Sequence, residues 1–557
     1  MNPVRLTFSR LFLAICALGL LPACPKYVDV NLKLLEPCDQ VSRALNGIRT
    51  YRIEVVEDDG EVNGASFSPG TSTPVQIGLG TTTEIDVLAW TEEAADSQSK
   101  PKSIGHTVLP GLPDDVGTEP IEVSVIMGLG DSMGKVSSMS EGGGSQCEEL
   151  TSGVTVDGRH AHTATYIPNI NKVLIIGGAI WIEDNQSGGR KESFLRSAEL
   201  WDPATGVFTQ LPELPQTRAY HTATALPDGD VFVAGGFSFI NGEKAALSGG
   251  FHFEPSRMTD DATEDACSTQ EKEGCPFVAV GLKARRAMHT ANLLGNDIVV
   301  LVGGCYGKGC ASDGVSDDGT GAGDPTELQS AGTVEVYNIA DKESAIAEGL
   351  INPRAMHASS VINSGGPSIL ISGGVSSQGP VCTMELLRLS AGTVDNLDSL
   401  SDAQRNLTVC PIRHQQVSLS DSRVALIGGQ TAAAGGRPEG LGVKTVQFWN
   451  SGIGIEAATA TLFEGRVGHT AHLLDNGSIL VYGGTLSTLG GAPAERLELT
   501  SGNSFVPTLL TFPPEAAFDR SAAAQLPNNQ IFVSGGHTDL KGGTLLSSKA
   551  AYLYFGE

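Results

Sequence analysis

The chain contains few aromatic and few basic residues. Aromatic residues make up 6% of its 557 positions, and 36 lysines and arginines stand against 63 aspartates and glutamates, which gives a net charge of −27. Such a charge repels nucleic-acid phosphates, so nucleic acid is not an expected partner. The sequence has no G-x-S-x-G elbow, no phosphate-binding loop and no H-E-x-x-H motif. It therefore predicts no catalytic residue, no metal and no cofactor.

Long hydrophobic runs are also scarce. The longest, from Leu11 to Leu21, follows Arg5 and Arg10 and is too short to span a bilayer comfortably. A positive stretch followed by a short apolar one is typical of a secretory signal peptide, here residues 1–23.

The residues after this run resemble the lipobox of bacterial lipoproteins. Leu21-Pro22-Ala23-Cys24 matches its L-x-A-C pattern. The resemblance implies that Cys24 becomes the lipidated first residue and that the protein is anchored to the cell envelope. No Asp follows Cys24, so the inner-membrane retention signal of that family is missing and the outer membrane is expected, with the leaflet open. Ordinary secretion with cleavage elsewhere is the alternative.

Ten cysteines include Cys16 in the signal and Cys24 at the lipobox. The remaining eight form an even set, which indicates disulfides in an exported chain. Eight cysteines allow 105 pairings, so the pairing stays open. Short loops favour Cys267–Cys275, Cys305–Cys310 and Cys382–Cys410, and Cys38–Cys147 would bracket an N-terminal domain.

Glycine, in contrast, is abundant, with 69 residues. Fourteen of these form seven pairs, each directly after an apolar stretch such as VFVAGG, at intervals of 52 to 70 residues. The pairs are Gly177-Gly178, Gly235-Gly236, Gly303-Gly304, Gly373-Gly374, Gly428-Gly429, Gly483-Gly484 and Gly535-Gly536. A repeat of this period indicates one supersecondary unit copied several times around a shared core.

The segment from Thr217 to Gly236 shows the unit most fully. Alternating residues up to Ala225 predict a first strand, Asp228-Gly229 a hairpin turn, and Val231 to Ala234 a buried second strand that ends at the glycine pair. Third and fourth strands are expected at 250–253 and 277–280. An Arg and a His precede the first strand in most repeats, and the fifth and seventh are expected to keep Arg413 and Arg520 but lose the His.

This combination of R-x-x-H-T-A, an apolar strand ending in Gly-Gly, and E-x-W/Y-D/N resembles the kelch repeat over about residues 151–557. The resemblance implies an all-β fold with a seven-bladed β-propeller of four-stranded blades. The seventh repeat has only three strands before the chain stops. We therefore expect the segment GVTV at 153–156 to supply the fourth strand and close the ring.

The expected domain order is a signal peptide at 1–23, a lipid anchor with a small β-sandwich-like domain at 24–130, a Gly/Ser-rich linker at 131–150 and the propeller at 151–557. Short strand-like runs at 27–35, 48–56, 84–90 and 121–127 support the small domain.

The repeated His and Arg residues occur once per blade, which favours a scaffold role over a ligand role. Residues two positions after the repeated Arg vary, and in related propellers ligands bind around that channel mouth. The candidate pocket residues are therefore Tyr220, Met288, Met356 and Gln415, with plain packing as the alternative.

Two classes of function fit this sequence. The first is a lipid-anchored envelope propeller that binds a protein or a glycan and performs no chemistry. The alternative is an exported carbohydrate-active enzyme on a kelch scaffold, similar to sialate mutarotases or to galactose oxidase, although no copper motif carries over from the latter.

Overall fold

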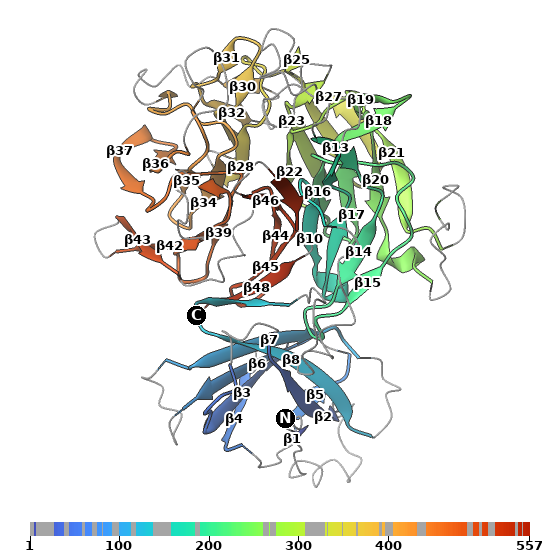
Figure 1. Ribbon diagram of the computed structural model, residues 1–557, viewed down its shortest axis with the longest axis vertical. Coiled ribbons are helices and arrows are strands. Elements are labelled where there is room, and N and C mark those ends of the chain that lie inside the picture. The colour runs from blue at the N-terminus through green and yellow to red at the C-terminus, as the bar shows by residue number, and fades with distance from the viewer. Residues whose placement is uncertain are drawn as a thin grey trace.

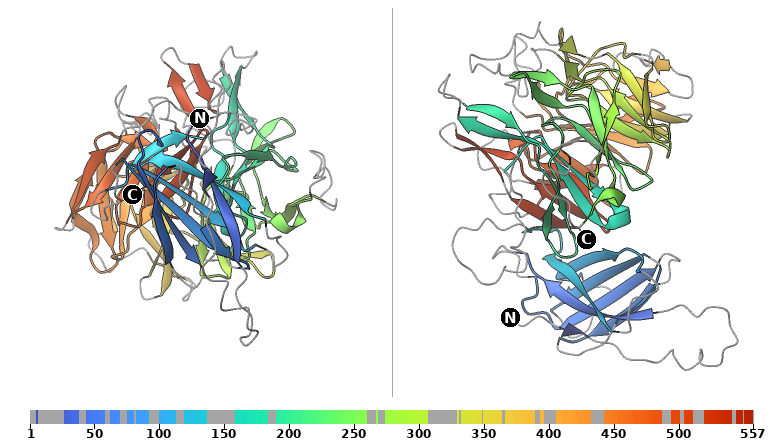
Figure 2. Two further views of the ribbon diagram at one scale, coloured as in Figure 1. Left: turned by 90° about the horizontal axis from the view of Figure 1, so that it is seen from below. Right: turned by 90° about the vertical axis from the view of Figure 1, so that its right-hand side faces the viewer.

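The computed structural model describes two all-β domains stacked end to end (Figure 1, Figure 2). The described residues are 5–6, 27–37, 44–57, 62–69, 75–80, 82–91, 100–112, 119–136, 158–183, 190–259, 267, 274–306, 329–330, 332–347, 349–363, 366–388, 393–395, 405–431, 442–486, 494–500, 504–510, 519–540, 544–548 and 550–556. Within them no helix is long and apolar enough to cross a membrane.

The N-terminal domain is one curled sheet around its own core. Its strand order is β1-β2-β8-β7-β6-β3-β4, β5 pairs with β2, and all neighbours are antiparallel except β2 and β8. The strands are β1 (Arg5–Leu6), β2 (Tyr27–Leu35), β3 (Thr50–Glu57), β4 (Val62–Phe67), β5 (Val75–Gly78), β6 (Thr83–Trp90), β7 (Ser103–Leu109) and β8 (Ile121–Leu129). Alternating residues of β2, β3 and β6 are buried, as period-two patterning requires. The small all-β domain is confirmed, with a single curled sheet where two facing sheets were expected.

The second domain is a seven-bladed β-propeller, as the repeat predicts. Each blade is a four-stranded antiparallel sheet. The first four are β10 (Thr163–Ile167), β11 (Lys172–Ile176), β14 (Ala198–Trp201) and β15 (Phe208–Gln210); β16 (Thr222–Ala225), β17 (Val231–Ala234), β20 (Gly249–Phe253) and β21 (Phe277–Gly281); β22 (Thr290–Leu294), β23 (Ile298–Val302), β26 (Val334–Asn338) and β27 (Glu343–Ile346); and β28 (Ala358–Asn363), β29 (Pro367–Ser372), β32 (Glu385–Arg388) and β33 (Thr393–Asp395).

The remaining blades follow the same order. Blade five has β34 (Gln415–Ser418), β35 (Arg423–Ile427), β36 (Thr445–Asn450) and β37 (Gly454–Thr461); blade six has β39 (Thr470–Leu473), β40 (Ile479–Tyr482), β42 (Ala494–Leu499) and β43 (Phe505–Leu509); blade seven has β44 (Ala522–Gln525), β45 (Gln530–Ser534), β48 (Ala551–Phe555) and β9 (Ser132–Lys135). The part of the chain that the structure describes also has the short 3-10 helices η2 (Pro168–Ile170) and η3 (Pro255–Arg257).

Short two-stranded sheets lie at the glycine-pair end of six blades. They are β12 (Ala179–Glu183) with β13 (Arg190–Phe194), β18 (Phe237–Ile240) with β19 (Glu243–Ala246), β24 (Cys305–Tyr306) with β25 (Gln329–Ser330), β30 (Val375–Ser376) with β31 (Gly379–Pro380), β38 (Arg466–Val467) with β41 (Thr485–Leu486), and β46 (His537–Leu540) with β47 (Thr544–Ser547). Consecutive hairpins from β47 through β12–β13, β18–β19 and β24–β25 to β30 contact one another. We call this continuous rim the hairpin crown.

The glycine pairs join adjacent blades. Both glycines of every pair have positive φ, for example 59° at Gly235 and 97° at Gly236. The Gly236 N–H donates to the carbonyl of Arg286 in the next blade at 2.9 Å. A Cβ on Gly235 would lie 2.4 Å from that same carbonyl oxygen. Glycine is therefore required for both the backbone conformation and the close approach.

An N-terminal strand closes the ring, but it is not the segment expected. β9 pairs with β48, with Met133 opposite Tyr554, whereas residues 153–156 lie outside the described residues. The expected linker at 131–150 therefore begins with a propeller strand. The sequence concealed β9 because its four residues, SMGK, show no apolar alternation and stand next to a Gly/Ser-rich stretch.

The closing strand also joins the two domains. β8 of the curled sheet leads into β9 through only Gly130 and Asp131. Leu35 and Ile126 of the first domain share one hydrophobic cluster with Trp201, Phe532 and Phe555 of the propeller. The Phe555 ring packs so closely on Gly128 that a Cβ there would overlap it, 2.0 Å from a ring carbon. The small domain is therefore packed against the propeller through a shared core.

Two disulfides match the expected short loops. Cys267–Cys275 and Cys382–Cys410 are both bonded. Cys305 is disulfide-bonded as well, whereas Cys24, Cys38, Cys147 and Cys310 lie outside the described residues. Persistent disulfides are typical of exported proteins.

Candidate functional site

Seven residues with left-handed backbone, one per blade, surround the mouth of the central channel. They are Ala161, Tyr220, Met288, Met356, Arg413, Gly468 and Arg520, with φ between 53° and 68°. Backbone hydrogen bonds link them from blade to blade: Met288 N donates to Tyr220 O at 3.0 Å, and Met356 N to Met288 O at 3.1 Å. Six of these residues are not glycine, and such strained backbone is often found at functional sites.

Three of the four candidate pocket residues belong to this ring. Tyr220, Met288 and Met356 occupy it, but Gln415 does not, because it begins β34. Arg413 takes the ring position of blade five and donates its N–H to Met356 O at 2.9 Å.

In blade five, the sequence prediction had therefore placed the repeated Arg two residues too late in the chain. Pro411 stands where other blades have the repeated Arg, because its carbonyl accepts from Gly374 N at 2.9 Å. The His that blade five was expected to lack is present as His414, whose Nε2 lies 2.7 Å from Ser372 Oγ. In blade seven, Arg520 is likewise the ring residue.

The repeated histidines link neighbouring blades. In four of them Nε2 contacts a hydroxyl of the preceding blade: His162 with Ser534 at 2.9 Å, His221 with Thr163 at 2.9 Å, His289 with Thr222 at 3.0 Å and His357 with Thr290 at 3.1 Å. Burial holds their pKa values well below the usual range, so they are neutral near pH 7. These contacts are those of a scaffold.

A polar cluster lies on one side of the channel mouth, where blades one, two and seven meet. It consists of His160, Glu192, Tyr220, Arg520 and His537, and we call it the mouth cluster. Tyr220 Oη donates to Glu192 Oε1 at 2.5 Å and accepts from Arg520 at 2.7 Å. His160 Nε2 lies 3.0 Å from the same Glu192 oxygen. The His537 ring meets the His160 ring edge-on, with centroids 4.9 Å apart.

The fold brings these residues together from distant parts of the chain. Glu192 comes from hairpin strand β13, Tyr220 from the entry to blade two, and Arg520 from the entry to blade seven, 300 residues after Tyr220. Tyr220 was the only member that the sequence identified as a pocket residue, whereas Arg520 was interpreted as the repeated Arg of the scaffold. Glu192 and His537 lie on hairpins that vary between blades, so the repeat carried no signal for them.

The electrostatics of the mouth cluster favour a fixed charge pattern. Burial alone would raise the pKa of Glu192, but the hydrogen bond with His160 and the nearby charges of Lys244 and Arg520 hold that pKa well below its usual range. Burial raises the pKa of Tyr220 far above 10, and the Glu192 charge adds to the shift. Burial, with Arg520 nearby, lowers the pKa of His537 to about 2. At neutral pH, Glu192 is therefore an anion, and Tyr220 and His537 are neutral.

Two acceptors of this region lack a hydrogen-bond donor among the described residues. They are the buried Oε2 of Glu192 and the buried Oδ1 of Asp519. Asp519 also lies 3.5 Å from His537 Nε2 through its other oxygen. Trp181 stacks on His160, with centroids 5.4 Å apart. Both oxygens are buried, so hydroxyl donors of a ligand would reach them only after neighbouring side chains move, and the Trp181 ring beside Glu192 could then pack against the carbon face of that ligand.

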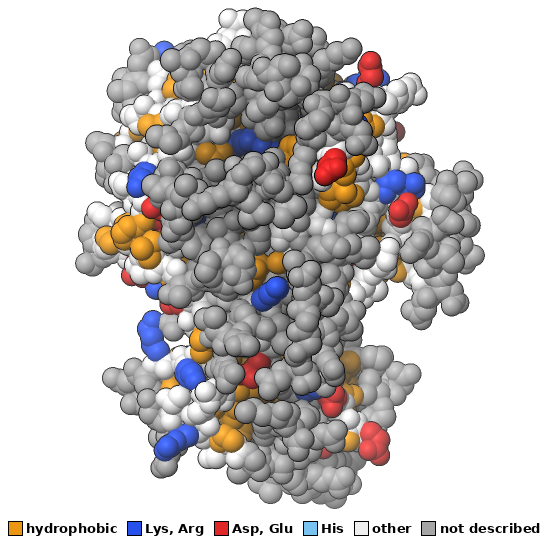
Figure 3. Space-filling view, in the orientation of Figure 1, with side chains coloured by type: hydrophobic (Ala, Val, Ile, Leu, Met, Phe, Trp, Pro, Cys, Tyr) orange, Lys and Arg blue, Asp and Glu red, His pale blue; other side chains and the backbone are white. Residues whose placement is uncertain are grey.

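Apolar side chains are exposed on the hairpin crown near this cluster. Ile182, Phe239, Ile240 and Tyr306 are between 36% and 43% exposed. They lie on three consecutive hairpins, β12–β13, β18–β19 and β24–β25, and Phe239 stacks on Phe194 at 4.8 Å. Figure 3 shows hydrophobic side chains beside basic ones near the middle of the propeller in this view. Exposed apolar groups around a polar centre are typical of an interaction surface.

A hollow of about 570 Å³ lies between the curled sheet and the hairpin turns of blades six and seven. Charged side chains that line this hollow, among them Asp86 and Arg496, form hydrogen bonds and ion pairs with neighbouring residues. Asp86 contacts His106 at 2.8 Å and accepts from Asn528 at 2.6 Å. Arg496 pairs with Asp131 and with Glu498. The contacts of Asp86 with Asn528 and of Arg496 with Asp131 link the propeller to the N-terminal part of the chain.

Comparison with known proteins adds no family to this picture. No protein-family model matches the chain, and no curated protein matches it.

Proposed function

We propose that this chain is a kelch-type propeller, anchored to the cell envelope by lipid at Cys24, that binds a protein or glycan through its hairpin crown. The mouth cluster carries the proposal, because it places a buried Glu192 oxygen that has no donor among the described residues beside the Trp181 ring, next to the apolar side chains exposed on the hairpins of blades one to three. Propellers present such a face on a rigid closed scaffold. The glycine pairs and the E-x-W/Y-D/N strands support the kelch assignment, and the disulfides support export.

The pKa directions favour binding over acid–base catalysis. A general acid or base works best when its pKa lies near the operating pH. In the mouth cluster the pKa of Glu192 is lowered and that of Tyr220 is raised, so both move away from neutrality. These groups are suited to holding a ligand by fixed charge and hydrogen bonds.

The binding experiment uses the mature chain on a glycan array and in pull-downs from envelope extracts. Tyr220→Phe removes the hydroxyl shared by Glu192 and Arg520, and Phe239→Ser with Tyr306→Ser removes two exposed apolar groups of the crown. We expect each variant to weaken binding at least tenfold. Ile453→Ser is the matched control, because Ile453 is 52% exposed on the β36–β37 turn, away from the crown. Ligand capture that is equal in all variants would overturn the proposal.

The alternative, a carbohydrate-active enzyme, rests on the contact of Tyr220 with both Glu192 and Arg520. A sugar-anomer exchange assay tests it directly, and metal analysis of the purified protein tests the oxidase form. Exchange above the uncatalysed rate that is lost in Tyr220→Phe would favour the enzyme.

The anchor is tested separately. Cys24→Ala should release the protein from the membrane fraction, and mass spectrometry of the wild-type N-terminus should show an acylated cysteine. An unmodified N-terminus elsewhere would refute the anchor without affecting the binding proposal.

A further inference from the structure

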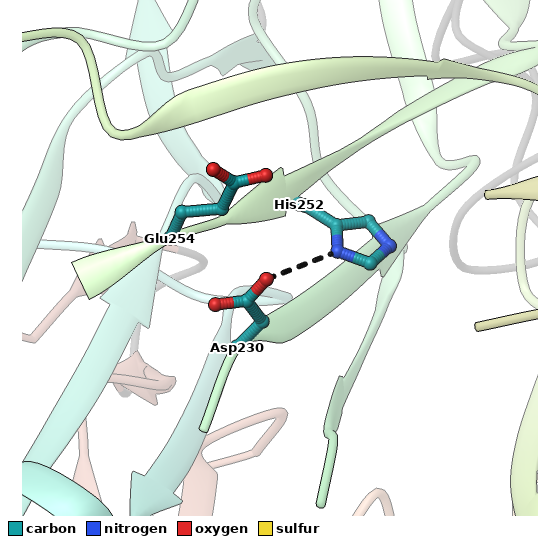
Figure 4. Close-up of side chains that lie close together, drawn as sticks. All are labelled: Asp230, His252 and Glu254. Atoms are coloured by element: carbon teal, nitrogen blue, oxygen red, sulfur yellow. Dashed lines mark hydrogen bonds and ion pairs between the residues drawn. The ribbon is translucent and has the colours of Figure 1, made fainter. Parts of the chain in front are cut away.

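Three side chains with metal-binding groups converge at the hairpin end of blade two, at the opposite end of the strands from the glycine pair (Figure 4). Asp230 directly precedes β17, His252 is in β20, and Glu254 directly follows β20. Their ligand atoms all lie within 4.8 Å of one another. His252 is fully buried, whereas Asp230 and Glu254 are partly exposed.

The strand register explains the convergence. Val231 pairs with Phe253 and Phe232 with His252, so Asp230 continues this register opposite Glu254. His252 and Glu254 are two residues apart on one strand and therefore point to the same face. One strand thus supplies two of the groups, and its neighbour supplies the third on that face.

The contact between His252 and Asp230 is long for a hydrogen bond and has the length expected between two ligands of one metal ion. His252 Nδ1 lies 3.4 Å from Asp230 Oδ2, beyond the usual range of about 2.7–3.2 Å for an N–H···O bond. Two ligands of a tetrahedral ion with bonds of about 2.0–2.1 Å are separated by roughly 3.4 Å. The separation of these two atoms therefore matches one edge of such a coordination sphere.

The second ring nitrogen of His252, Nε2, already has a hydrogen-bonding partner. His252 Nε2 lies 2.6 Å from Tyr337 Oη in blade three, and the Tyr337 ring stacks on Phe232 with centroids 4.0 Å apart. A metal-binding histidine commonly uses its second nitrogen in this way, which fixes the ring and its tautomer. When Nε2 donates to Tyr337, the lone pair of Nδ1 faces the carboxylates.

The charged groups around the cluster would favour a bound cation. The two neighbouring basic side chains both form ion pairs with Glu254: Lys342 Nζ at 2.6 Å and Arg257 Nη1 at 3.9 Å. Carboxylates placed opposite each other across a strand pair repel, and a divalent ion between them would remove that repulsion.

We propose that Asp230, His252 and Glu254 form a binding site for a divalent transition-metal ion of the Zn²⁺ class. One imidazole and two carboxylates are ligands that Zn²⁺ accepts, and a fourth position remains for water. The ion would lie at the seam of blades two and three. Glu254 would exchange its ion pair with Lys342 for the metal. This site is independent of the mouth cluster and of the proposed ligand.

The test uses the full mature chain without a histidine tag, first stripped with a chelator. Zn²⁺ stoichiometry is measured by mass spectrometry after dialysis, affinity by competition with a chromogenic chelator, and coordination by the visible spectrum with Co²⁺. We expect one tightly bound ion, a loss of affinity of at least tenfold in Asp230→Asn and His252→Gln, and loss of the Co²⁺ bands. Asp228→Asn is the matched control and should bind within about threefold of the wild type.

Lys342→Gln provides a measurement that does not disturb the buried imidazole. Freed from its ion pair, Glu254 should bind Zn²⁺ more tightly, so the affinity should rise. If Asp230→Asn and Asp228→Asn bind Zn²⁺ equally, or if the wild type binds no stoichiometric ion at micromolar concentration, the cluster is only a polar brace between blades and the proposal is wrong.

Discussion

Two arginines at equivalent positions of adjacent blades should respond very differently to the same substitution. Arg286 of blade three is fully buried and pairs with the buried Glu335 at 3.0 Å. Arg218 of blade two is equally buried, but Phe251 stands where a glutamate would pair with it. The Arg218 guanidinium lies 4.0 Å from the Phe251 ring centroid and donates to Gly235 O at 2.8 Å. We therefore propose Arg286→Met and Arg218→Met as a matched pair.

The expected magnitudes follow from the partners. Arg286→Met leaves the Glu335 carboxylate buried without its cation, and breaking a buried pair in this way costs about 3–5 kcal/mol. For Arg218, burial lowers the pKa to about 9 from a usual 12.5. The buried guanidinium therefore carries a desolvation cost at neutral pH. Its hydrogen bonds and its cation–π contact offset part of this cost. Arg218→Met should therefore change stability by less than about 1.5 kcal/mol.

The assay is urea unfolding at pH 7, followed by tryptophan fluorescence, with stabilities compared at a common denaturant slope. A double variant, Arg286→Met with Glu335→Leu, should recover most of the loss, because it removes the orphaned carboxylate. Equal losses for the two single variants, or no recovery in the double variant, would refute the reasoning.

Further predictions concern closure, the domain junction and acid. Met133→Ala should lower the free energy of unfolding by about 2–5 kcal/mol, because Met133 of the closing strand is buried against Ile531 and Tyr552. In calorimetry, Lys135→Ala on the same strand should lower it much less. Similar losses in the two variants would argue against closure by β9. Phe555→Ala should cost about 3–5 kcal/mol and split the calorimetric transition into two, since Phe555 joins the domains; an unchanged single transition at the wild-type temperature would contradict this. Burial lowers the pKa of His414 and His469 to about 3 and that of His472 to about 4. The free energy of unfolding should therefore be highest above pH 6.5. Below pH 6.5 it should fall by up to about 1.4 kcal/mol per pH unit for each histidine, because the unfolded chain binds a proton that the folded protein does not. Unfolding free energies that stay constant from pH 7 to pH 4.5 would show that these histidines are not buried as neutral groups.

Much of the fold was predictable because a repeated local pattern encodes it. Each glycine pair reports a required positive φ and a close carbonyl of the next blade, and both requirements act on single residues. The fully buried second strands, such as Val231–Ala234, follow from their continuous apolar sequence. Where the pattern degraded, the prediction failed: in blade five Arg413 was taken for the repeated Arg, although Pro411 holds that place.

The candidate sites were less predictable because their residues do not follow the repeat. Tyr220 could be found as a variable position at the channel mouth, but its partners Glu192 and Arg520 come from a hairpin and from the last blade. The Asp230, His252 and Glu254 cluster had no recognisable motif, because 22 residues separate Asp230 from its contact with His252. Strand register alone brings the three together.

The sequence by itself determined the seven blades and two disulfides, because each depends on residues close together in the chain. The tertiary structure decided which strand closes the ring, how the small domain joins the propeller, and which charged groups meet at the channel mouth. The physical reason is that closing a ring brings the first and last blades into contact. Pairings between Tyr554 and Met133, or between Arg520 and Tyr220, therefore depend on the whole circle of blades.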